Sequence, residues 1–192
     1  MRIVPFLLGI AIVVPAFATV VPEGDFGPIT LTGVTSSMQP SLAGGVIYDR
    51  LVPFAPAGGA RGGTRGQLQV RVLKTAGGRL DFYWSVRNDA TSTEAIKQIS
   101  IVGYPSQSYD VNWRLDGLGS VAPTQVTGAT GGTGGARSIT FVFGTPVAPG
   151  QTSRAFYIST GYRTMVSDPA TFARIKTVGG VFYNLPAFLP RP

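Results

Sequence analysis

The chain has 192 residues, which is the size of a single domain, and it contains no histidine and no cysteine. These absences exclude a Ser-His-Asp triad, a thiol nucleophile and imidazole or thiolate metal ligands, so we expect no metal site and no cofactor. The 16 Lys and Arg residues against 9 Asp and Glu give a net charge of +7, which favours an anionic partner such as an extracellular polysaccharide or an envelope surface, although a solvated basic surface also explains it.

The first residues have the layout of a secretory signal peptide. Arg2 precedes an apolar run over residues 3–14, and small residues follow that run. The run is shorter than the roughly 20 apolar residues that span a bilayer, which argues against a membrane anchor. We therefore predict a signal peptide over residues 1–18 that is cleaved after Ala18, and a single secreted domain over residues 19–192 with no transmembrane segment.

Alternation of apolar and polar residues predicts antiparallel strands with one buried and one solvated face. Residues 67–87 alternate on both sides of a glycine-rich turn and therefore predict a hairpin. In the window 95–103, Ile96 and Ile99 break the alternation, which predicts a bulge or a late start of the strand. The strands predicted outside the hairpin are 45–52, 95–103, 109–115, 137–144, 153–160 and 174–183.

Apart from a helical signal segment, the sequence predicts at most one short helix, near residues 168–174. Ser167 or Asp168 can cap this helix, and Pro169 fits its first position. Elsewhere, 26 glycines and 15 prolines interrupt nearly every window that is long enough for a helix. The sequence therefore predicts an all-β fold, an antiparallel two-sheet β-sandwich of jelly-roll or Ig-like type, with a closed barrel as the alternative.

The chemistry that remains possible without histidine and cysteine is a carboxylate pair, a Ser/Lys dyad or an oxygen-only calcium site. Asp81, Asp110 and Asp116 lie on the polar faces of predicted strands, so we expect solvated carboxylates there. Asp110, Asn112 and Asp116 alternate as calcium ligands do, but Arg114 occupies a ligand position. A strand followed by a turn explains these residues better than a calcium loop.

Two glycine-rich stretches, 57–66 and 127–136, are predicted to be mobile loops, because glycine has no side chain to pack and loses much entropy on ordering. Arg61 and Arg65 in the first stretch resemble the RGG segments of nucleic-acid-binding proteins. Two arginines are too few for that function, and we expect no nucleic-acid partner.

Aromatic residues supply the one positive indication of binding. Candidate ligand-binding side chains, able to form a stacking platform for sugar rings, are Tyr83, Tyr104, Tyr162 and Tyr183. A structural role for these tyrosines is the alternative. Trp84 and Trp113 share the apolar faces of their strands and are expected in the core.

Three segments together resemble the extracytoplasmic domains of bacterial proteins that carry a PEP-CTERM sorting signal. They are LDFYWSVRN at 80–88, SYDVNWRLDG at 108–117 and ITFVFGTPVAPGQTSRAFYIST at 139–160. The resemblance implies export to the envelope or matrix of a Gram-negative bacterium, often alongside exopolysaccharide production, and it carries over no catalytic residue. The sequence departs from the family by lacking the Pro-Glu-Pro motif, the terminal apolar helix and the basic tail.

Three hypotheses of function follow from these features. The first is a secreted, non-catalytic structural or surface-associated protein of the bacterial exterior. The second is a carbohydrate-binding or adhesion module, favoured by the tyrosines and the basic charge. The third is a glycosidase, which requires two acids roughly 5–9.5 Å apart in a cleft.

Overall fold

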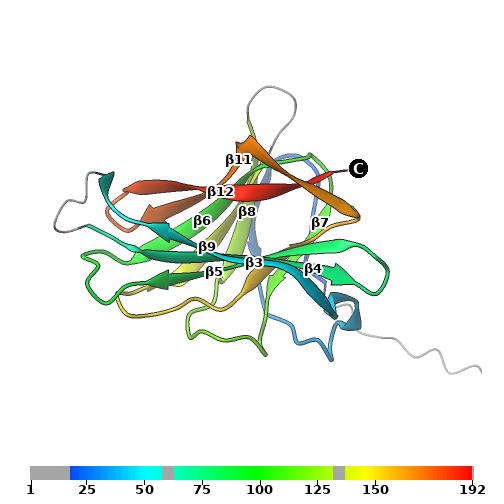
Figure 1. The fold of residues 1–192 in the computed structure, drawn as a ribbon, viewed down its shortest axis with the longest axis horizontal. Coiled ribbons are helices and arrows are strands. Elements are labelled where there is room, and N and C mark those ends of the chain that lie inside the picture. Colours follow the sequence, from blue (N-terminus) through cyan, green and yellow to red (C-terminus); the bar gives the residue numbers. More distant parts are fainter. Residues whose placement is uncertain (1–17, 58–62, 132–136, 192) are drawn as a thin grey trace, which may run out of the picture.

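The alternating residues form two six-stranded antiparallel sheets that pack face to face, as Figure 1 shows. The computed structural model describes residues 18–57, 63–131 and 137–191. In this part of the chain the predicted all-β fold, an antiparallel two-sheet β-sandwich, is confirmed. The predicted signal peptide, except for Ala18, lies outside the described residues. Among the described residues, no helix has the length and apolar character needed to cross a membrane.

Each sheet draws its strands from distant parts of the sequence. Sheet A consists, in spatial order, of β1 (Val20–Val21), β7 (Tyr109–Trp113), β10 (Phe156–Ser159), β5 (Leu80–Asn88), β4 (Gly66–Thr75) and β3 (Gly44–Phe54). Sheet B consists of β12 (Phe182–Arg191), β11 (Thr164–Thr177), β6 (Ile96–Tyr104), β9 (Arg137–Val147), β8 (Gln125–Thr130) and β2 (Phe26–Thr30). One short 3-10 helix, η1 (Pro40–Leu42), precedes β3.

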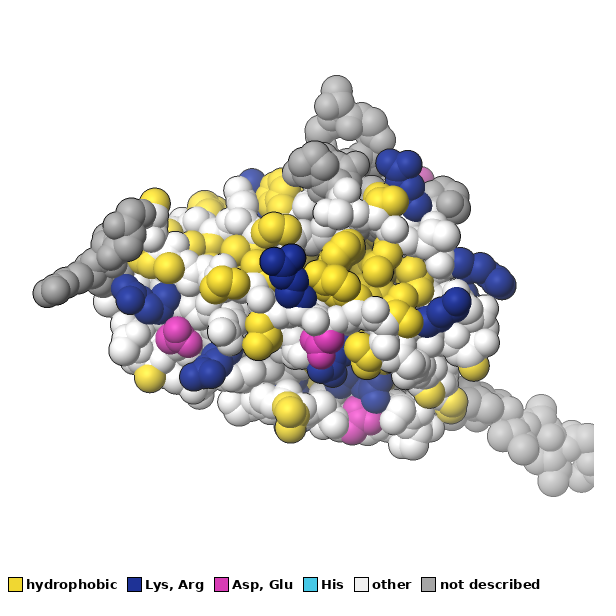
Figure 2. Space-filling view, viewed as in Figure 1, with side chains coloured by type: hydrophobic (Ala, Val, Ile, Leu, Met, Phe, Trp, Pro, Cys, Tyr) yellow, Lys and Arg dark blue, Asp and Glu magenta, His cyan; other side chains and the backbone are white. Residues whose placement is uncertain are grey.

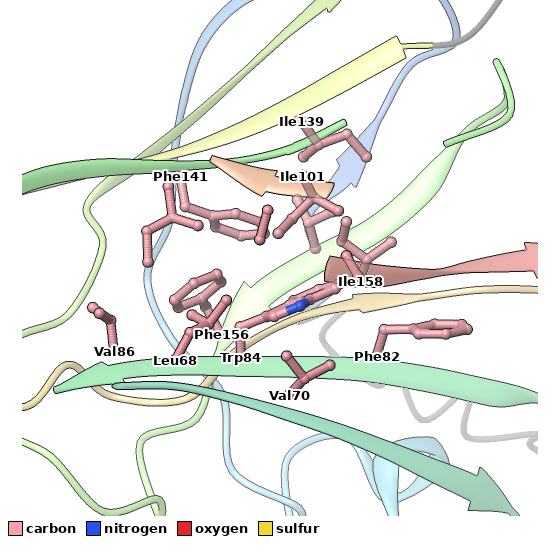
Figure 3. Packing of buried hydrophobic residues seen from close by; sticks show 14 of the residues in the cluster. Leu68, Val70, Phe82, Trp84, Val86, Ile101, Ile139, Phe141, Phe156 and Ile158 are labelled. Atoms are coloured by element: carbon pink, nitrogen blue, oxygen red, sulfur yellow. The ribbon is translucent and has the colours of Figure 1, made fainter. Parts of the chain in front are cut away.

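Side chains that face inward from both sheets form the core (Figure 3). Buried and partly exposed residues alternate along most of β4 and β9, as the two-residue period of a strand requires. Trp84 of sheet A stacks on Phe156, and Phe156 meets Phe141 of sheet B with ring centroids 4.6 Å apart. Burial of each large apolar side chain contributes roughly 1.5–3 kcal/mol, so core packing can stabilise a chain without disulfides.

Most of the predicted strands are confirmed. The hairpin predicted at 67–87 is formed by β4 and β5, which pair from Gly66 and Asn88 to Lys74 and Leu80. Strands predicted at 45–52, 95–103, 109–115, 137–144 and 153–160 correspond to β3, β6, β7, β9 and β10. The irregularity predicted in 95–103 is confirmed by a shift in the β6–β9 register between Ile96 and Gln98.

The helix predicted near residues 168–174 is wrong. Residues 172–176 pair with β6 on one side and with β12 on the other, so this stretch belongs to β11. Pro169 fits the start of a helix, but two ladders of backbone hydrogen bonds outweigh that local preference. The register between β11 and β12 shifts between Ser167 and Phe172, and such irregular positions are where a strand tolerates proline.

The strand predicted at 174–183 is also wrong, because this window contains a turn. β11 ends at Thr177 and β12 begins at Phe182. Gly180 in the turn has a φ of +89°, a conformation that favours glycine, and its backbone N–H donates to the carbonyl oxygen of Thr177 at 3.1 Å. The alternating pattern continues through the turn and hides the reversal of the chain.

The free edges of the two sheets meet at β3 and β12. The ring of Tyr48 on β3 packs against Phe188 on β12, with centroids 4.5 Å apart. Figure 2 shows this side of the molecule, where hydrophobic side chains gather between the two edges and Lys and Arg side chains lie around them. Pro53 in β3 and Pro186 in β12 remove backbone donors, as is common in edge strands.

A segment between β2 and β3 covers the outer face of sheet A. At its start, the N–H of Val34 donates to the carbonyl of Trp113 on β7, at 2.9 Å. At its end, η1 leads into β3. Because β10, β5 and β4 lie between β7 and β3, residues 33–43 must cross all three strands. We call residues 33–43 the covering segment.

Candidate functional site

Strand register brings polar side chains together in rows on the outer face of sheet A. Asp81 on β5 is opposite Ser159 on β10, and Ser159 is opposite Asp110 on β7. In the next row, Tyr157 on β10 is opposite Tyr83 on one side and Asn112 on the other. Two acids and two tyrosines therefore occupy neighbouring positions of the same face.

The covering segment buries this part of the face. Leu42 of η1 is 1% exposed and forms a small apolar cluster with Val34, Tyr83 and Tyr157. The side chain of Gln39 reaches both kinds of polar residue: its amide nitrogen donates to Asp110, and its oxygen accepts a 3.3 Å hydrogen bond from the Tyr157 hydroxyl. This part of the outer face of sheet A is therefore a second, smaller interior.

The expectation of a solvated carboxylate is wrong for Asp81, which is 0% exposed. Its Oδ1 accepts a hydrogen bond of 2.7 Å from Ser159, while its Oδ2 is buried without a hydrogen-bond partner. Burial raises the pKa of Asp81 to about 6, the Ser159 hydrogen bond opposes this rise, and the charge of Asp110 adds to it. The sequence correctly placed Asp81 on the outer face, but the covering segment shields that face from water.

Asp110 and Asp116 have opposite pKa shifts, because Asp110 is largely buried and Asp116 is exposed. Burial raises the pKa of Asp110 against the hydrogen bonds from Gln39 and Thr19. Asp116 is exposed, and its carboxylate accepts two hydrogen bonds from Arg114, at 2.8 and 2.9 Å. Those bonds hold the pKa of Asp116 well below its usual range. Only Asp116 of the three acids matches the solvated carboxylate that the sequence predicts.

A cavity of about 310 Å³ opens beside this buried cluster on the outer face of sheet A. Tyr83, Gln69 and Ser85 line it, together with Arg71 and Arg114. Arg71 pairs with Asp49 at 2.6 Å, and Arg114 contacts the Tyr83 hydroxyl at 3.4 Å. The cavity therefore offers several hydrogen-bond donors and the edge of a buried aromatic residue, at the small end of the size range of ligand pockets.

The four candidate tyrosines do not form one platform. Tyr104 is 0% exposed in the main core, where its ring packs on Phe82, Trp84 and Tyr109, so we remove it from the ligand-binding candidates. Simple alternation from Ile99 and Ile101 would point Tyr104 outward, but the β6–β9 register shifts between Val102 and Tyr104, and this irregularity turns the ring inward.

The other three tyrosines lie in separate parts of the molecule. Tyr83 is buried beneath the covering segment and borders the cavity. The hydroxyl of Tyr162, in the loop between β10 and β11, donates to Gln107 at 2.8 Å. The hydroxyl of Tyr183 on β12 accepts from the N–H of Thr64 at 3.3 Å. Each of these hydroxyls thus has a partner within the chain.

The outer face of sheet B carries a surface that the sequence did not reveal. Register aligns a central row of Thr127, Thr140, Ser100, Arg174 and Asn184, flanked by a row of Gln125, Val142, Gln98, Lys176 and Phe182 and a row of Ala129, Ser138, Val102, Phe172 and Pro186. None of these positions is acidic. This face is polar and basic, and among the described residues no segment comparable to residues 33–43 crosses it.

Aromatic rings hold the cations of this face in place. The guanidinium carbon of Arg174 lies 5.1 Å from the ring centre of Phe172 and 5.6 Å from that of Phe182. The ammonium group of Lys176 lies 5.3 Å from the ring centre of Phe182. Cation–π contacts orient the two charges without neutralising them, so the charges stay available to an anion. We call Phe172, Arg174, Lys176 and Phe182 the basic aromatic patch.

A second group of cations gathers at the turn between β4 and β5. Lys74, Arg79 and Arg163 are exposed, and Gly78 lies beside both Lys74 and Arg163. Within the described residues, none of the three forms an ion pair. No aromatic ring contacts these cations, which distinguishes this group from the basic aromatic patch.

Comparisons with protein families, with curated proteins and with solved structures found no match for this chain. What the geometry defines is a two-sheet β-sandwich with one covered outer face and one open, basic outer face. The function must therefore be argued from these two surfaces.

Proposed function

We propose that this chain is an exported, non-catalytic β-sandwich protein that associates with the cell surface or extracellular matrix of a Gram-negative bacterium by binding anionic polysaccharide. The signal-peptide pattern of residues 1–18 and the resemblance to PEP-CTERM proteins support export to that location. The net charge of +7 supports an anionic partner.

The single observation that carries the proposal is the open outer face of sheet B. Its paired rows contain Arg174 and Lys176 and no acid, so no internal carboxylate competes with an anionic ligand. In the same row, the exposed Asn184 accepts a hydrogen bond from Nε of Arg174 at 3.0 Å and keeps its amide N–H groups for sugar oxygens, whereas the hydroxyls of Thr140 and Ser100 bond to each other. Exposed Phe182 supplies a flat apolar ring for the face of a sugar.

The test is the binding of purified protein to alginate, a linear polyuronate, with dextran as the neutral control. We expect the chain to bind alginate, with an affinity that falls as the salt concentration rises, and not to bind dextran. The double variant Arg174→Gln/Lys176→Gln should weaken alginate binding by at least about tenfold. Absence of alginate binding by the unmodified protein would refute the proposal.

A matched control removes the same amount of charge from the other basic surface. Lys74→Gln/Arg163→Gln should change alginate binding by less than about threefold, because no aromatic ring contacts these cations and orients them towards a sugar. Equal losses for both double variants would show that net charge, rather than the face of sheet B, determines the binding.

The cavity on sheet A favours the second candidate function, a carbohydrate-binding module for a short sugar. Gln69, Ser85 and Arg71 present polar groups around a space of about 310 Å³. A glycan array should then show one defined sugar whose binding falls when Gln69 or Ser85 becomes alanine. Thr140→Ala, on the opposite outer face, is the control that should leave this binding unchanged.

The acids give little support to a glycosidase. Asp116 is the one acid that lines the cavity, and Arg114 holds its carboxylate in the ionised form, whereas a general acid needs a raised pKa. Asp81 has a raised pKa but does not border the cavity. Robust hydrolysis of a glycan by the purified protein would contradict a non-catalytic role.

A further inference from the structure

Five oxygen-bearing side chains converge between sheet A and the covering segment. Asp81, Ser159 and Asp110 form one row across β5, β10 and β7, and Tyr157 follows in the next row. Gln39 approaches from the covering segment and contacts both Asp110 and Tyr157. We call these five side chains the oxygen cluster.

The charge of Arg79 acts on Asp81, but no cation within the described residues lies close enough to either Asp81 or Asp110 to form an ion pair. Asp81 is 0% exposed, and its Oδ2 is buried without any hydrogen-bond partner. Strand register puts Asp81 and Asp110 on either side of Ser159, and Gln39 links Asp110 to Tyr157, so these side chains border the same space. A buried carboxylate oxygen left unsatisfied beside a second carboxylate requires an explanation.

We propose that the oxygen cluster is a binding site for a divalent cation, and for Ca²⁺ in particular. Ca²⁺ takes six to eight oxygen ligands in flexible arrangements, chiefly carboxylates, amide carbonyls and water, and weaker oxygen donors can fill the remaining positions. Asp81 and Asp110 supply the charge, Ser159 and Tyr157 supply hydroxyl oxygens, and water completes the shell on the half-buried side of Asp110.

Because Gln39 belongs to the covering segment, a cation bound at this site would also link that segment to sheet A. The Gln39 amide nitrogen currently faces Asp110, and a rotation of the amide group would turn Oε1 towards the cation instead. The ligands would then come from β5, β10, β7 and the covering segment at once. Bound Ca²⁺ would fasten the covering segment to sheet A, a role that is independent of polysaccharide binding on sheet B.

The sequence did not predict this site because its ligands are not adjacent in the chain. A calcium loop presents alternating acids within about twelve residues, and the run from Asp110 to Asp116 fails that test at Arg114. Here the two acids and Gln39 are separated by long stretches of sequence, and only strand pairing unites them.

The first test measures thermal unfolding of metal-free protein at pH 7 while Ca²⁺ is added. We expect Tm to rise with Ca²⁺ concentration, by about 5–10 °C at one hundred times Kd, and to rise less with Mg²⁺. Asp81→Asn should abolish the rise, while Asp49→Asn, which removes an exposed acid paired with Arg71, should preserve it. A Tm that does not change when Ca²⁺ is added up to about 10 mM would overturn the proposal.

A second measurement detects the ion directly. Tb³⁺ replaces Ca²⁺ in oxygen sites, and Tyr157 in the cluster should sensitise its luminescence in the unmodified protein. Added Ca²⁺ should quench this signal by competition, and Asp110→Asn should weaken Tb³⁺ affinity at least tenfold. Luminescence that persists unchanged in both Asp81→Asn and Asp110→Asn would overturn the proposal, as would stability that responds to pH but never to Ca²⁺.

Discussion

The two outer faces of the sandwich obey the same alternating pattern but have opposite environments. On sheet A, the covering segment packs on Tyr157, and Asp81 on the same face is buried as well, so side chains at polar positions form a second interior. On sheet B, Arg174 and Lys176 occupy equivalent outward positions, and their charges remain partly exposed. Alternation therefore fixes which way a side chain points, whereas a distant segment of chain decides whether it meets water.

The largest expected effect comes from loosening the covered face. Leu42→Ala should lower the free energy of unfolding by about 2–4 kcal/mol, because it leaves a cavity in the small cluster around Tyr83 and Tyr157. Leu51→Ala, at a position that is 54% exposed on β3, should change it by less than about 0.5 kcal/mol. Urea unfolding of both variants provides the measurement, and equal effects would show that the segment does not pack as described.

An effect of intermediate size and opposite sign on the free energy of unfolding is expected when the buried Asp81 is replaced. Since the folded pKa of Asp81 is raised to about 6, its ionisation costs stability as pH rises from about 4 to 6. Asp81→Asn should therefore raise the free energy of unfolding at pH 7, in metal-free buffer, by about 1–3 kcal/mol and have little effect below pH 4.

Asp116 supplies the control for this pH dependence. Its pKa is lowered by Arg114, so its contribution is present above pH 4 and lost as pH falls. Asp116→Asn should thus lower stability at pH 7, by less than about 1 kcal/mol because the pair is partly exposed. Unfolding curves at pH 4 and pH 7 that shift in the same direction for both variants would contradict the assigned environments.

The smallest effect on stability is expected on the open face. Arg174→Gln/Lys176→Gln should change the free energy of unfolding by less than about 1 kcal/mol, since it removes only partly exposed cation–π contacts. The same double variant should lose alginate binding. A loss of several kcal/mol would instead make the patch a structural element of sheet B.

Local sequence patterns suffice to predict the hairpin at 67–87, but they do not predict that Asp81 is buried. Residues 67–87 carry both the alternation and the turn, so all the information lies within one stretch. Asp81 lies on the face that residues about 40 positions earlier cover, which no local pattern reports. One clue was available: Tyr83 shares the supposedly polar face of β5, and a large aromatic residue beside an acid indicates that this face is covered.

The strand β8 was missed for a related reason. Residues 127–130 of β8 belong to the stretch 127–136 that composition predicts to be a loop, but Gly128 is an inward position of sheet B that pairs with Ile139. The ring of Phe26 from β2 occupies the space that a side chain at Gly128 would fill. A glycine at a close approach of two strands has the same sequence signature as a glycine in a loop, and only the partner strand distinguishes them.

The covering segment also imposes an order on folding. Its hydrogen bonds from Gln39 to Asp110 and from Ser36 to Asp116 join residues 71 and 80 positions apart. Ribosomal synthesis releases this early stretch first, yet its docking surface exists only after β7 and β10 have formed. Residues 33–43 can therefore dock only after more than three quarters of the chain has been synthesised. Their packing on sheet A is then a late step in folding.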